Sequence, residues 1–144
     1  MSHQKIEYVM DCKLSKNCFK QVQSIILKVF GSAHIDPKGS YILAMSGENV
    51  LGVAQVTEEE SKVYIWNFCV EPEERGKGRG TGILMHTKLC FGEFFAEVYI
   101  DNPYLDFYLN RGGEVVSYDE NEKFYTLKFP EQNELTCKKV KKSD

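Results

Sequence analysis

A run of alternating glycines constrains this chain more than any other part of its sequence. Residues 75–82 read RGKGRGTG, with glycine at every second position from Gly76 to Gly82. Because glycine has no side chain, a backbone that carries it can approach a partner closely. The apolar, β-branched run at 62–70 predicts a strand buried on both faces before this segment, and Thr81 begins a helical pattern after it. The N–H groups and the dipole at a helix N-terminus favour bound phosphate.

Three basic side chains lie in the same segment, which makes it a predicted diphosphate site. Arg75, Lys77 and Arg79 alternate with the glycines. The Walker pattern G-x-x-x-x-G-K-[ST] is absent, which disfavours ATP and GTP hydrolysis, and the absence of G-x-G-x-x-G disfavours a dinucleotide. A basic linker, an RG-type nucleic-acid segment or a plain turn would carry similar residues. Linkers and RG segments usually have low-complexity surroundings, whereas a strand and a helix flank this segment directly.

Periodicity along the rest of the chain predicts a mixed α/β fold. Ser15 is a candidate helix N-cap and Gly31 a candidate stop, with apolar residues at helical spacing between them. Further helices are expected at 81–91 and from Asp101-Asn102-Pro103 to about Arg111, with Gly112 and Gly113 as the stop of the second. Strands are expected at residues 6–13, 41–46, 51–57, 62–70, 93–100, 114–118 and 123–129. We expect one domain over residues 1–130 and a loose, polar, lysine-rich tail over 131–144.

Composition narrows the class of protein and its compartment. The chain has a net charge of −3. Its five cysteines form no C-x-x-C pair and its three histidines are scattered, so we expect no metal site. The sequence shows no signal peptide and no apolar run of membrane-spanning length. We therefore expect a reducing, cytoplasmic setting, with the nucleus as an alternative, and no membrane partner. The acidic balance favours a cationic partner, and the lysines at 138–142 favour a solubilising tail over a nucleic-acid patch.

Two segments carry a resemblance to a known family. Val70–Gly82 resembles the acetyl-CoA signature of the GNAT superfamily of N-acetyltransferases, whose pattern Q/R-x-x-G-x-G/A is met by Arg75, Gly78 and Gly80. Asp101–Gly113 resembles the family segment that carries an asparagine, an aromatic pair and a glycine after a short helix. The expected order of strands and helices resembles the same fold from end to end.

The resemblance implies an architecture and an activity. The fold would be a mixed, mostly antiparallel sheet of about six or seven strands, splayed at the acetyl-CoA site and flanked by about three to four helices. The activity would be transfer of an acetyl group from acetyl-CoA to a primary amine by direct attack in a ternary complex. The acceptor would be a small amine or polyamine, or a lysine or N-terminal amine of a peptide. The protein would act as a monomer or a homodimer.

The resemblance also implies which residues hold the coenzyme. The pantetheine arm would pair with the main chain of the strand at 62–70, in a gap beside the strand at 93–100. A backbone N–H at Phe68 or Cys69 would face the thioester oxygen and stabilise the tetrahedral oxyanion. The implied coenzyme-binding residues are Phe68, Cys69, Val70, Arg75, Gly76, Lys77, Gly78, Arg79, Gly80, Thr81, Asn102 and Tyr104. The sequence around Asn102 equally favours a helix cap, with Pro103 at the first helical position.

Tyr108 resembles the family's general acid, which would protonate the leaving thiolate. A phenol with an unperturbed pKa of about 10 is protonated at neutral pH and can donate that proton. The competing interpretation is an aromatic side chain that closes the core beside Phe107.

The general base stays open at this point. Tyr64–Asn67 contains no carboxylate, and Thr57 cannot act as a base at neutral pH. The remaining candidates are the glutamates of the expected turn Glu58–Ser61, or a water chain held by Asn67 and Tyr64, although such glutamates are typical of a solvated hairpin tip. His86 is expected to be exposed or structural. The missing carboxylate leaves one alternative function, a non-catalytic acetyl-CoA-binding sensor or partner module.

Overall fold

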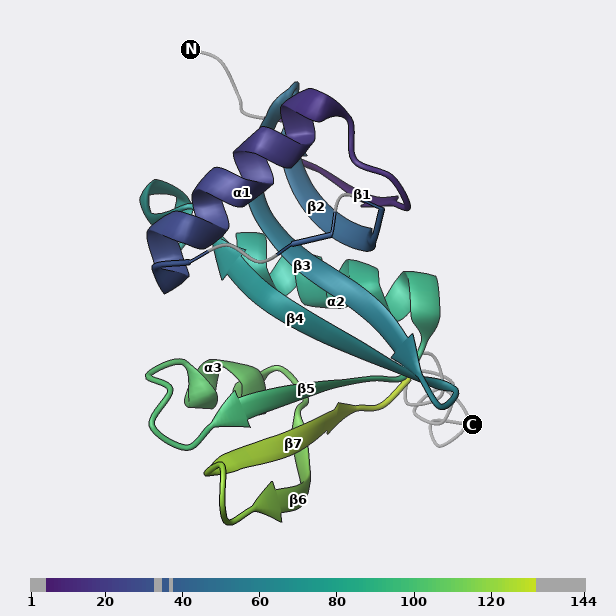
Figure 1. Ribbon diagram of the computed structural model, residues 1–144, viewed down its shortest axis with the longest axis vertical. Helices are drawn as coiled ribbons and strands as arrows, with labels where there is room; N and C mark the ends of the chain where they lie inside the picture. The colour runs from purple at the N-terminus through teal and green to yellow at the C-terminus, as the bar shows by residue number, and fades with distance from the viewer. Residues whose placement is uncertain (1–4, 33–34, 37, 132–144) are drawn as a thin grey trace, which may run out of the picture. The chain divides into compact units, whose positions relative to one another are not determined.

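The computed structural model describes residues 5–32, 35–36 and 38–131 (Figure 1). Within them, seven strands form one sheet in the order β1-β2-β3-β4-β5-β7-β6. Three α-helices and one 3₁₀ helix complete the set, which confirms the expected mixed, mostly antiparallel α/β class. The elements are β1 Glu7–Asp11, α1 Lys16–Phe30, β2 Ser40–Ser46, β3 Asn49–Glu59, β4 Lys62–Val70, η1 Pro72–Glu74, α2 Arg79–Phe91, β5 Phe94–Tyr99, α3 Leu105–Asn110, β6 Glu114–Asp119 and β7 Phe124–Phe129.

The chain divides into two compact units. The first comprises Met1–Thr57 and Ile65–Thr87, and the second comprises Glu58–Tyr64 and Lys88–Asp144. Of the predicted lysine-rich tail at 131–144, residues 132–144 lie outside the described residues. None of the helices in the described part of the chain is both long and apolar enough to cross a membrane.

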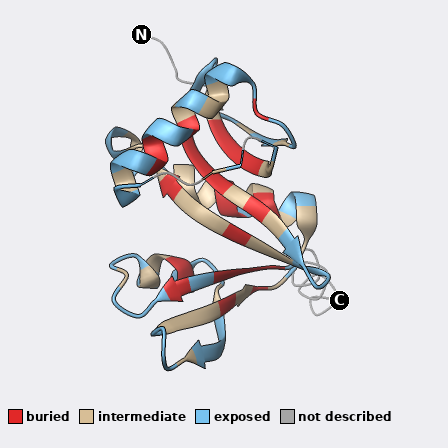
Figure 2. Cartoon of the chain, viewed as in Figure 1, coloured by how far each residue is buried: buried red, intermediate tan, exposed pale blue. Residues whose placement is uncertain are grey.

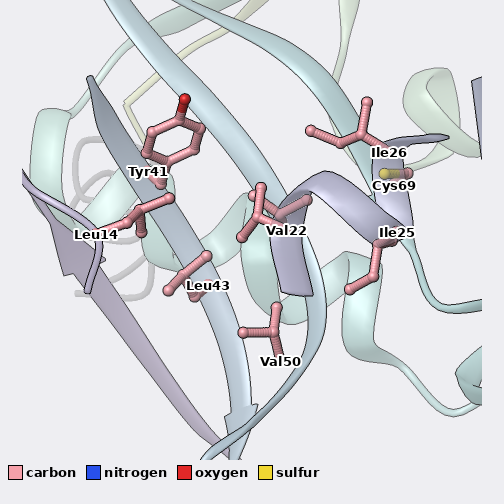
Figure 3. Packing of buried hydrophobic residues seen from close by; sticks show 9 residues of the cluster. Leu14, Val22, Ile25, Ile26, Tyr41, Leu43, Val50 and Cys69 are labelled. Atoms are coloured by element: carbon pink, nitrogen blue, oxygen red, sulfur yellow. The ribbon is translucent and has the colours of Figure 1, made fainter. Parts of the chain in front are cut away.

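Helix α1 supplies one side of the first unit's core. Its start is fixed by Ser15, whose Oγ accepts the Cys18 N–H at 3.1 Å. Its end is fixed by Gly31, which adopts φ 82° and donates its N–H to the Leu27 carbonyl at 2.8 Å. Both predicted helix boundaries are confirmed. The buried face of the helix packs against residues of β2, β3 and β4, as Figure 3 shows; the labelled cluster is Leu14, Val22, Ile25, Ile26, Tyr41, Leu43, Val50 and Cys69.

The β2–β3 hairpin lies beneath this helix and is tied to it by one side chain. Figure 2 shows long buried stretches along both strands, and the register pairs Leu43 with Val53. The Gln21 amide bridges helix and hairpin, since its Nε2 donates to the Glu48 carbonyl and its Oε1 accepts the Val50 N–H, each at 2.8 Å. The hydrogen bonds hold the hairpin in place, while the apolar cluster under the helix contributes about 25 cal/mol per Å² of area removed from water.

Two expectations for the following strands need correction. β3 runs to Glu59, so Glu58 and Glu59 belong to the strand, and the turn consists of Glu60 and Ser61 at φ 52° and 71°. β4 has the expected bounds, but burial on both faces is not found. Only Ile65 and Cys69 are buried within it, while most of its other residues are partly exposed.

The second unit is built from β5, β6, β7 and α3. The register of β5 and β7 places Phe94 opposite Phe129, and their rings stack with centroids 4.6 Å apart. α3 ends before Gly112, whose φ of 102° confirms the expected helix stop. The helix starts later than expected, however. The Asn102 Oδ1 accepts the Tyr104 N–H at 2.7 Å, and this side-chain turn keeps Pro103 outside the helix.

Candidate active site

The segment after β4 leaves the sheet through a short, fixed turn. The Glu71 N–H donates to the Leu51 carbonyl of β3 at 2.8 Å, which extends the strand pairing by one bond. η1 follows at Pro72–Glu74, and the Arg75 N–H donates to the Pro72 carbonyl. The Glu71 carboxylate also forms an ion pair with Lys28 of α1, and this hydrogen bond raises the pKa of the Lys28 ammonium. The start of the loop is therefore held to both the sheet and α1.

Gly76 and Gly78 give the loop its shape through their backbone conformation. Their φ angles are 78° and 84°, a region that residues with a side chain rarely adopt. A Cβ atom built on either glycine would meet no protein atom within 4 Å. Backbone conformation, rather than crowding by the protein, therefore requires glycine at these two positions.

Helix α2 begins inside the glycine run, two residues before the expected Thr81. Its first intrahelical bond joins the Gly82 N–H to the Gly78 carbonyl at 3.0 Å. Glycine is a poor helix former, so the sequence pattern placed Arg79 and Gly80 in the loop instead. Arg79, Gly80 and Thr81 form the first turn of this helix, and the N-terminal turn of a helix favours a bound anion.

The basic residues of this segment are organised by a carboxylate that the sequence interpretation missed. Glu74 lies 3.3 Å from the Arg79 Nε and 3.8 Å from the Lys77 Nζ. The Arg79 side chain is only 13 % exposed, and its Nη1 donates to the Lys77 carbonyl, whereas the Lys77 side chain is 50 % exposed. Arg79 thus braces the loop itself, and Lys77 is the more accessible cation.

Strand β4 carries a left-handed residue immediately before the predicted oxyanion position. Asn67 adopts φ 52°, and its Nδ2 donates to the Gln55 Oε1 of β3 at 3.0 Å. Asparagine tolerates this conformation better than most residues, yet it still departs from a regular strand just before Phe68. An asparagine within an otherwise β-branched and aromatic run was the available sequence signal. Trp66 is fixed nearby, because its Nε1 donates to the Thr57 Oγ1 at 2.7 Å.

The thiol that follows Phe68 is not reactive at neutral pH. Cys69 is buried, and this burial raises the pKa of its thiol to about 12, although Arg75 acts in the opposite direction. Because the thiolate is the nucleophilic form, this side chain contributes packing rather than covalent catalysis.

The other predicted site residues belong to the second unit and gather around α3. Tyr108 is buried, with its ring edge-on to Phe107 at 5.8 Å and to Phe129 at 6.4 Å between centroids. Asn102 and Tyr104 contact each other through the side-chain turn described above, and Tyr104 is half exposed. These contacts confirm the packing interpretation of the Tyr108 ring, and its role as a general acid stays a prediction.

The second unit also brings acidic groups to an aromatic side chain. Burial raises the pKa of the Tyr64 phenol, and Glu97, Glu59 and Glu60 raise it further. The pKa of the Glu97 carboxyl is raised as well, by partial burial and by Glu59 and Asp119. Glu97 was not predicted as a site residue, although it is the lone charge in the apolar strand FFAEVY.

Among residues 5–32, 35–36 and 38–131, no group of three or more His, Cys, Asp or Glu side chains is placed to hold a metal ion.

Comparisons with known proteins agree with this geometry. The acetyltransferase (GNAT) family matches residues 9–116. Among curated proteins, none matches the chain. The fold is similar to that of Escherichia coli ElaA, with a TM-score of 0.68 and 15 % identity over 86 % of this chain and 99 % of that one.

Two further similar structures were solved with a coenzyme or an analogue bound. PaiA N-acetyltransferase of Thermoplasma acidophilum, in complex with coenzyme A, has a TM-score of 0.64 and 14 % identity over 88 % of this chain and 99 % of that one. Arabidopsis thaliana Naa50, in complex with the bisubstrate analogue CoA-Ac-MVNAL, has a TM-score of 0.61 and 20 % identity over 84 % and 97 %.

Proposed function

From the premise that this chain belongs to the acetyltransferase (GNAT) family, we propose that it transfers an acetyl group from acetyl-CoA to a primary amine. The observation that carries the proposal is the segment from Gly76 to Thr81. Two left-handed glycines lead directly into the N-terminal turn of helix α2, where three basic residues alternate with the glycines. A pyrophosphate matches this arrangement, because it presents several acceptor oxygens and negative charge to N–H donors.

The proposed coenzyme site follows the chain from β4 into α2. Phe68, Cys69 and Val70 pair through their main chain with the pantetheine arm, and the segment 75–81 binds the pyrophosphate. The resemblance adds Asn102 and Tyr104 to the residues that hold the coenzyme. Support comes from the loop conformation and from the coenzyme A bound to the similar PaiA structure.

We place oxyanion stabilisation on the main chain at Phe68 or Cys69. The left-handed Asn67 supports this role, because it interrupts regular strand geometry directly before Phe68. A positioned N–H donor acts on charge that develops in the transition state, and removal of one such donor costs roughly 10²–10³ in rate.

Tyr108 is proposed as the general acid that protonates the departing thiolate. The proton passes from the Tyr108 Oη to the coenzyme sulfur as the carbon–sulfur bond breaks, and the phenol then recovers a proton from solvent. Support comes from the residue type and its place in α3, which match the family segment.

For the general base, Glu97 joins the glutamates of the β3–β4 hairpin as a candidate. The raised pKa makes the Glu97 carboxylate a stronger base, which favours removal of a proton from an amine. The Glu97 charge also raises the pKa of the Tyr64 phenol, so these two side chains interact. Both Glu97 and Glu60 are exposed, and Glu97 is preferred because partial burial and neighbouring carboxylates raise the pKa of its carboxyl.

Direct attack of the amine on the thioester is favoured over an acetyl-cysteine intermediate. The buried Cys69, with a pKa of about 12, is protonated at neutral pH. In an initial-rate experiment that varies acetyl-CoA and amine together, direct attack predicts intersecting double-reciprocal lines. Parallel lines would indicate a covalent intermediate instead.

Two measurements test the function and separate it from the sensor alternative. Titration calorimetry with acetyl-CoA reports binding, and release of free CoA thiol is followed with spermidine, a lysine peptide and a peptide with a free N-terminus. The proposal predicts binding and amine-dependent thiol release. Binding without release across this panel would support a non-catalytic module, and absence of binding would contradict both.

A further inference from the structure

One glycine of the loop segment faces the protein itself. A Cβ atom on Gly82 would overlap the Tyr8 ring at its Cζ and Oη atoms and would lie 2.5 Å from its Cε1. Real Cβ atoms essentially never show separations below 3.0 Å, so a side chain at position 82 would force either the Tyr8 ring or helix α2 to move. Gly82 lies within helix α2 and therefore has no backbone conformation that demands glycine. Glycine at this position instead leaves room for the Tyr8 ring against the helix.

Tyr8 reaches α2 from the first strand of the first unit. It pairs with Ala44 across the β1–β2 ladder, which fixes its backbone, and its side chain is partly buried. Its ring centroid lies 6.5 Å from that of His86, one helical turn after Gly82, with the ring planes tilted by 32°. The phenol ring therefore lies along the first two turns of α2.

A second glycine brings α2 close to β3 at the adjacent residue. A Cβ atom on Gly52 would lie 2.9 Å from the Ile83 Cδ1 and 3.2 Å from the Cys69 carbonyl oxygen. Ile83 is fully buried there. Two consecutive residues of α2 therefore make close contacts that depend on a glycine. Gly82 contacts Tyr8 of β1, and Ile83 contacts Gly52 of β3. These contacts set the distance of the helix from both strands.

We infer that Tyr8 is a positioning residue of the coenzyme site, because its ring against Gly82 sets the location of the first turn of α2. The inference rests on the proposed function. Gly80 and Thr81, whose N–H groups are assigned to the pyrophosphate, directly precede Gly82 in the helix. Hydrogen-bond strength depends on distances of a few tenths of an ångström, so a displaced helix weakens coenzyme binding without loss of a coenzyme ligand.

The test begins with Gly82→Ala, measured by titration calorimetry with coenzyme A. Alanine is a better helix former than glycine, so helix propensity alone predicts no loss. Displacement of α2 by the clash predicts roughly tenfold weaker binding. Kinetically, the KM for acetyl-CoA is expected to rise by a similar factor while the KM for the amine stays within about twofold.

Rescue at Tyr8 distinguishes positioning from general damage. Tyr8→Ala removes the obstacle, so the double variant Tyr8→Ala with Gly82→Ala is expected to bind coenzyme A more tightly than Gly82→Ala alone. Tyr8→Ala by itself is expected to weaken binding by about threefold, since the helix loses its contact, and Tyr8→Phe is expected to retain the affinity that Tyr8→Ala loses. Gly47→Ala is the matched control, because it strains a left-handed glycine in the β2–β3 turn, away from α2.

Each outcome decides one of the two claims. If the wild-type protein does not bind coenzyme A, the proposed function is overturned. If it binds, but Gly82→Ala binds equally well or the second substitution fails to restore affinity, the positioning role of Tyr8 is overturned. Should Gly82→Ala not fold in a thermal melt, the comparison of Tyr8→Ala with Tyr8→Phe decides, and equal affinities for these two variants contradict the inference.

Discussion

The loop before α2 and the segment around α3 reach defined conformations by different physical means. The loop is shaped locally, by the φ angles of Gly76 and Gly78 and by the ion pairs of Glu74. The α3 segment is shaped by packing, because Tyr108 is held by ring contacts with Phe107 and Phe129. A site assembled from local backbone conformation can be recognised in a sequence motif. A site assembled from packing depends on partners far apart in the chain.

The largest expected effect comes from Tyr108→Phe, which separates the chemical role of the phenol from its packing. The ring contacts remain, so stability and the Kd for acetyl-CoA are expected to stay near wild type. Loss of the acid predicts a fall in kcat of about 10²-fold, measured by thiol release at saturating substrates. An unchanged kcat with lower stability would leave Tyr108 a purely structural residue.

Gly78→Ala tests the loop before α2, whose shape is expected to depend mainly on backbone conformation. A side chain at φ 84° costs about 1–2 kcal/mol, so the loop rearranges or the protein loses that much stability. We expect roughly tenfold weaker coenzyme binding, with kcat at saturation much less affected. Gly31→Ala, which strains a similar φ of 82° at the end of α1, is the control and should lower stability alone.

Glu97→Gln tests the second unit through the pH dependence of its stability. Because the pKa of Glu97 is raised in the folded state, its contribution to stability is present below the unfolded pKa and is lost as pH rises through the folded pKa. Replacement by glutamine therefore predicts a slightly higher melting temperature at pH 8, with little difference at pH 4.

The same variant reports on catalysis. If Glu97 is the base, the acidic limb of the kcat/KM profile changes shape and the rate falls by roughly tenfold or more. A profile identical to wild type would assign proton removal to the hairpin glutamates or to solvent.

The smallest effect is expected from Lys28→Met, which breaks the ion pair with Glu71 at the start of the loop. Lys28 is exposed, and exposed pairs contribute little because water screens them. Melting temperature and coenzyme affinity should both stay close to wild type at 0.15 M salt. A clear loss of affinity would show that the loop depends on α1 rather than on its own glycines.

The sequence predicted best the features that depend on a single residue and its immediate neighbours. Ser15 and Gly31 bound α1 as expected, because a side-chain cap and a left-handed glycine act locally. The same reasoning located the loop and the strand before it, and with them the coenzyme half of the candidate site.

Features that depend on contacts across the fold were missed. The reason for Gly82 is a ring from β1, about 70 residues earlier in the chain, which no local pattern reveals. Pro103 lies outside α3 because the Asn102 side chain forms a turn first. Glu97 was overlooked because its raised pKa arises from partial burial in the fold and from Glu59 and Asp119 on other strands. The general base itself stays a prediction, with Glu97 as one candidate beside the hairpin glutamates.

The central claim is that the amides from Gly76 to Thr81 bind the pyrophosphate of acetyl-CoA. The most direct measurement is a backbone NMR titration of the isotope-labelled protein with acetyl-CoA, followed amide by amide. We expect saturable shifts that are largest at Gly76, Gly78, Gly80 and Thr81. Saturable binding that leaves these four amides unmoved, or no binding at all, would contradict the account.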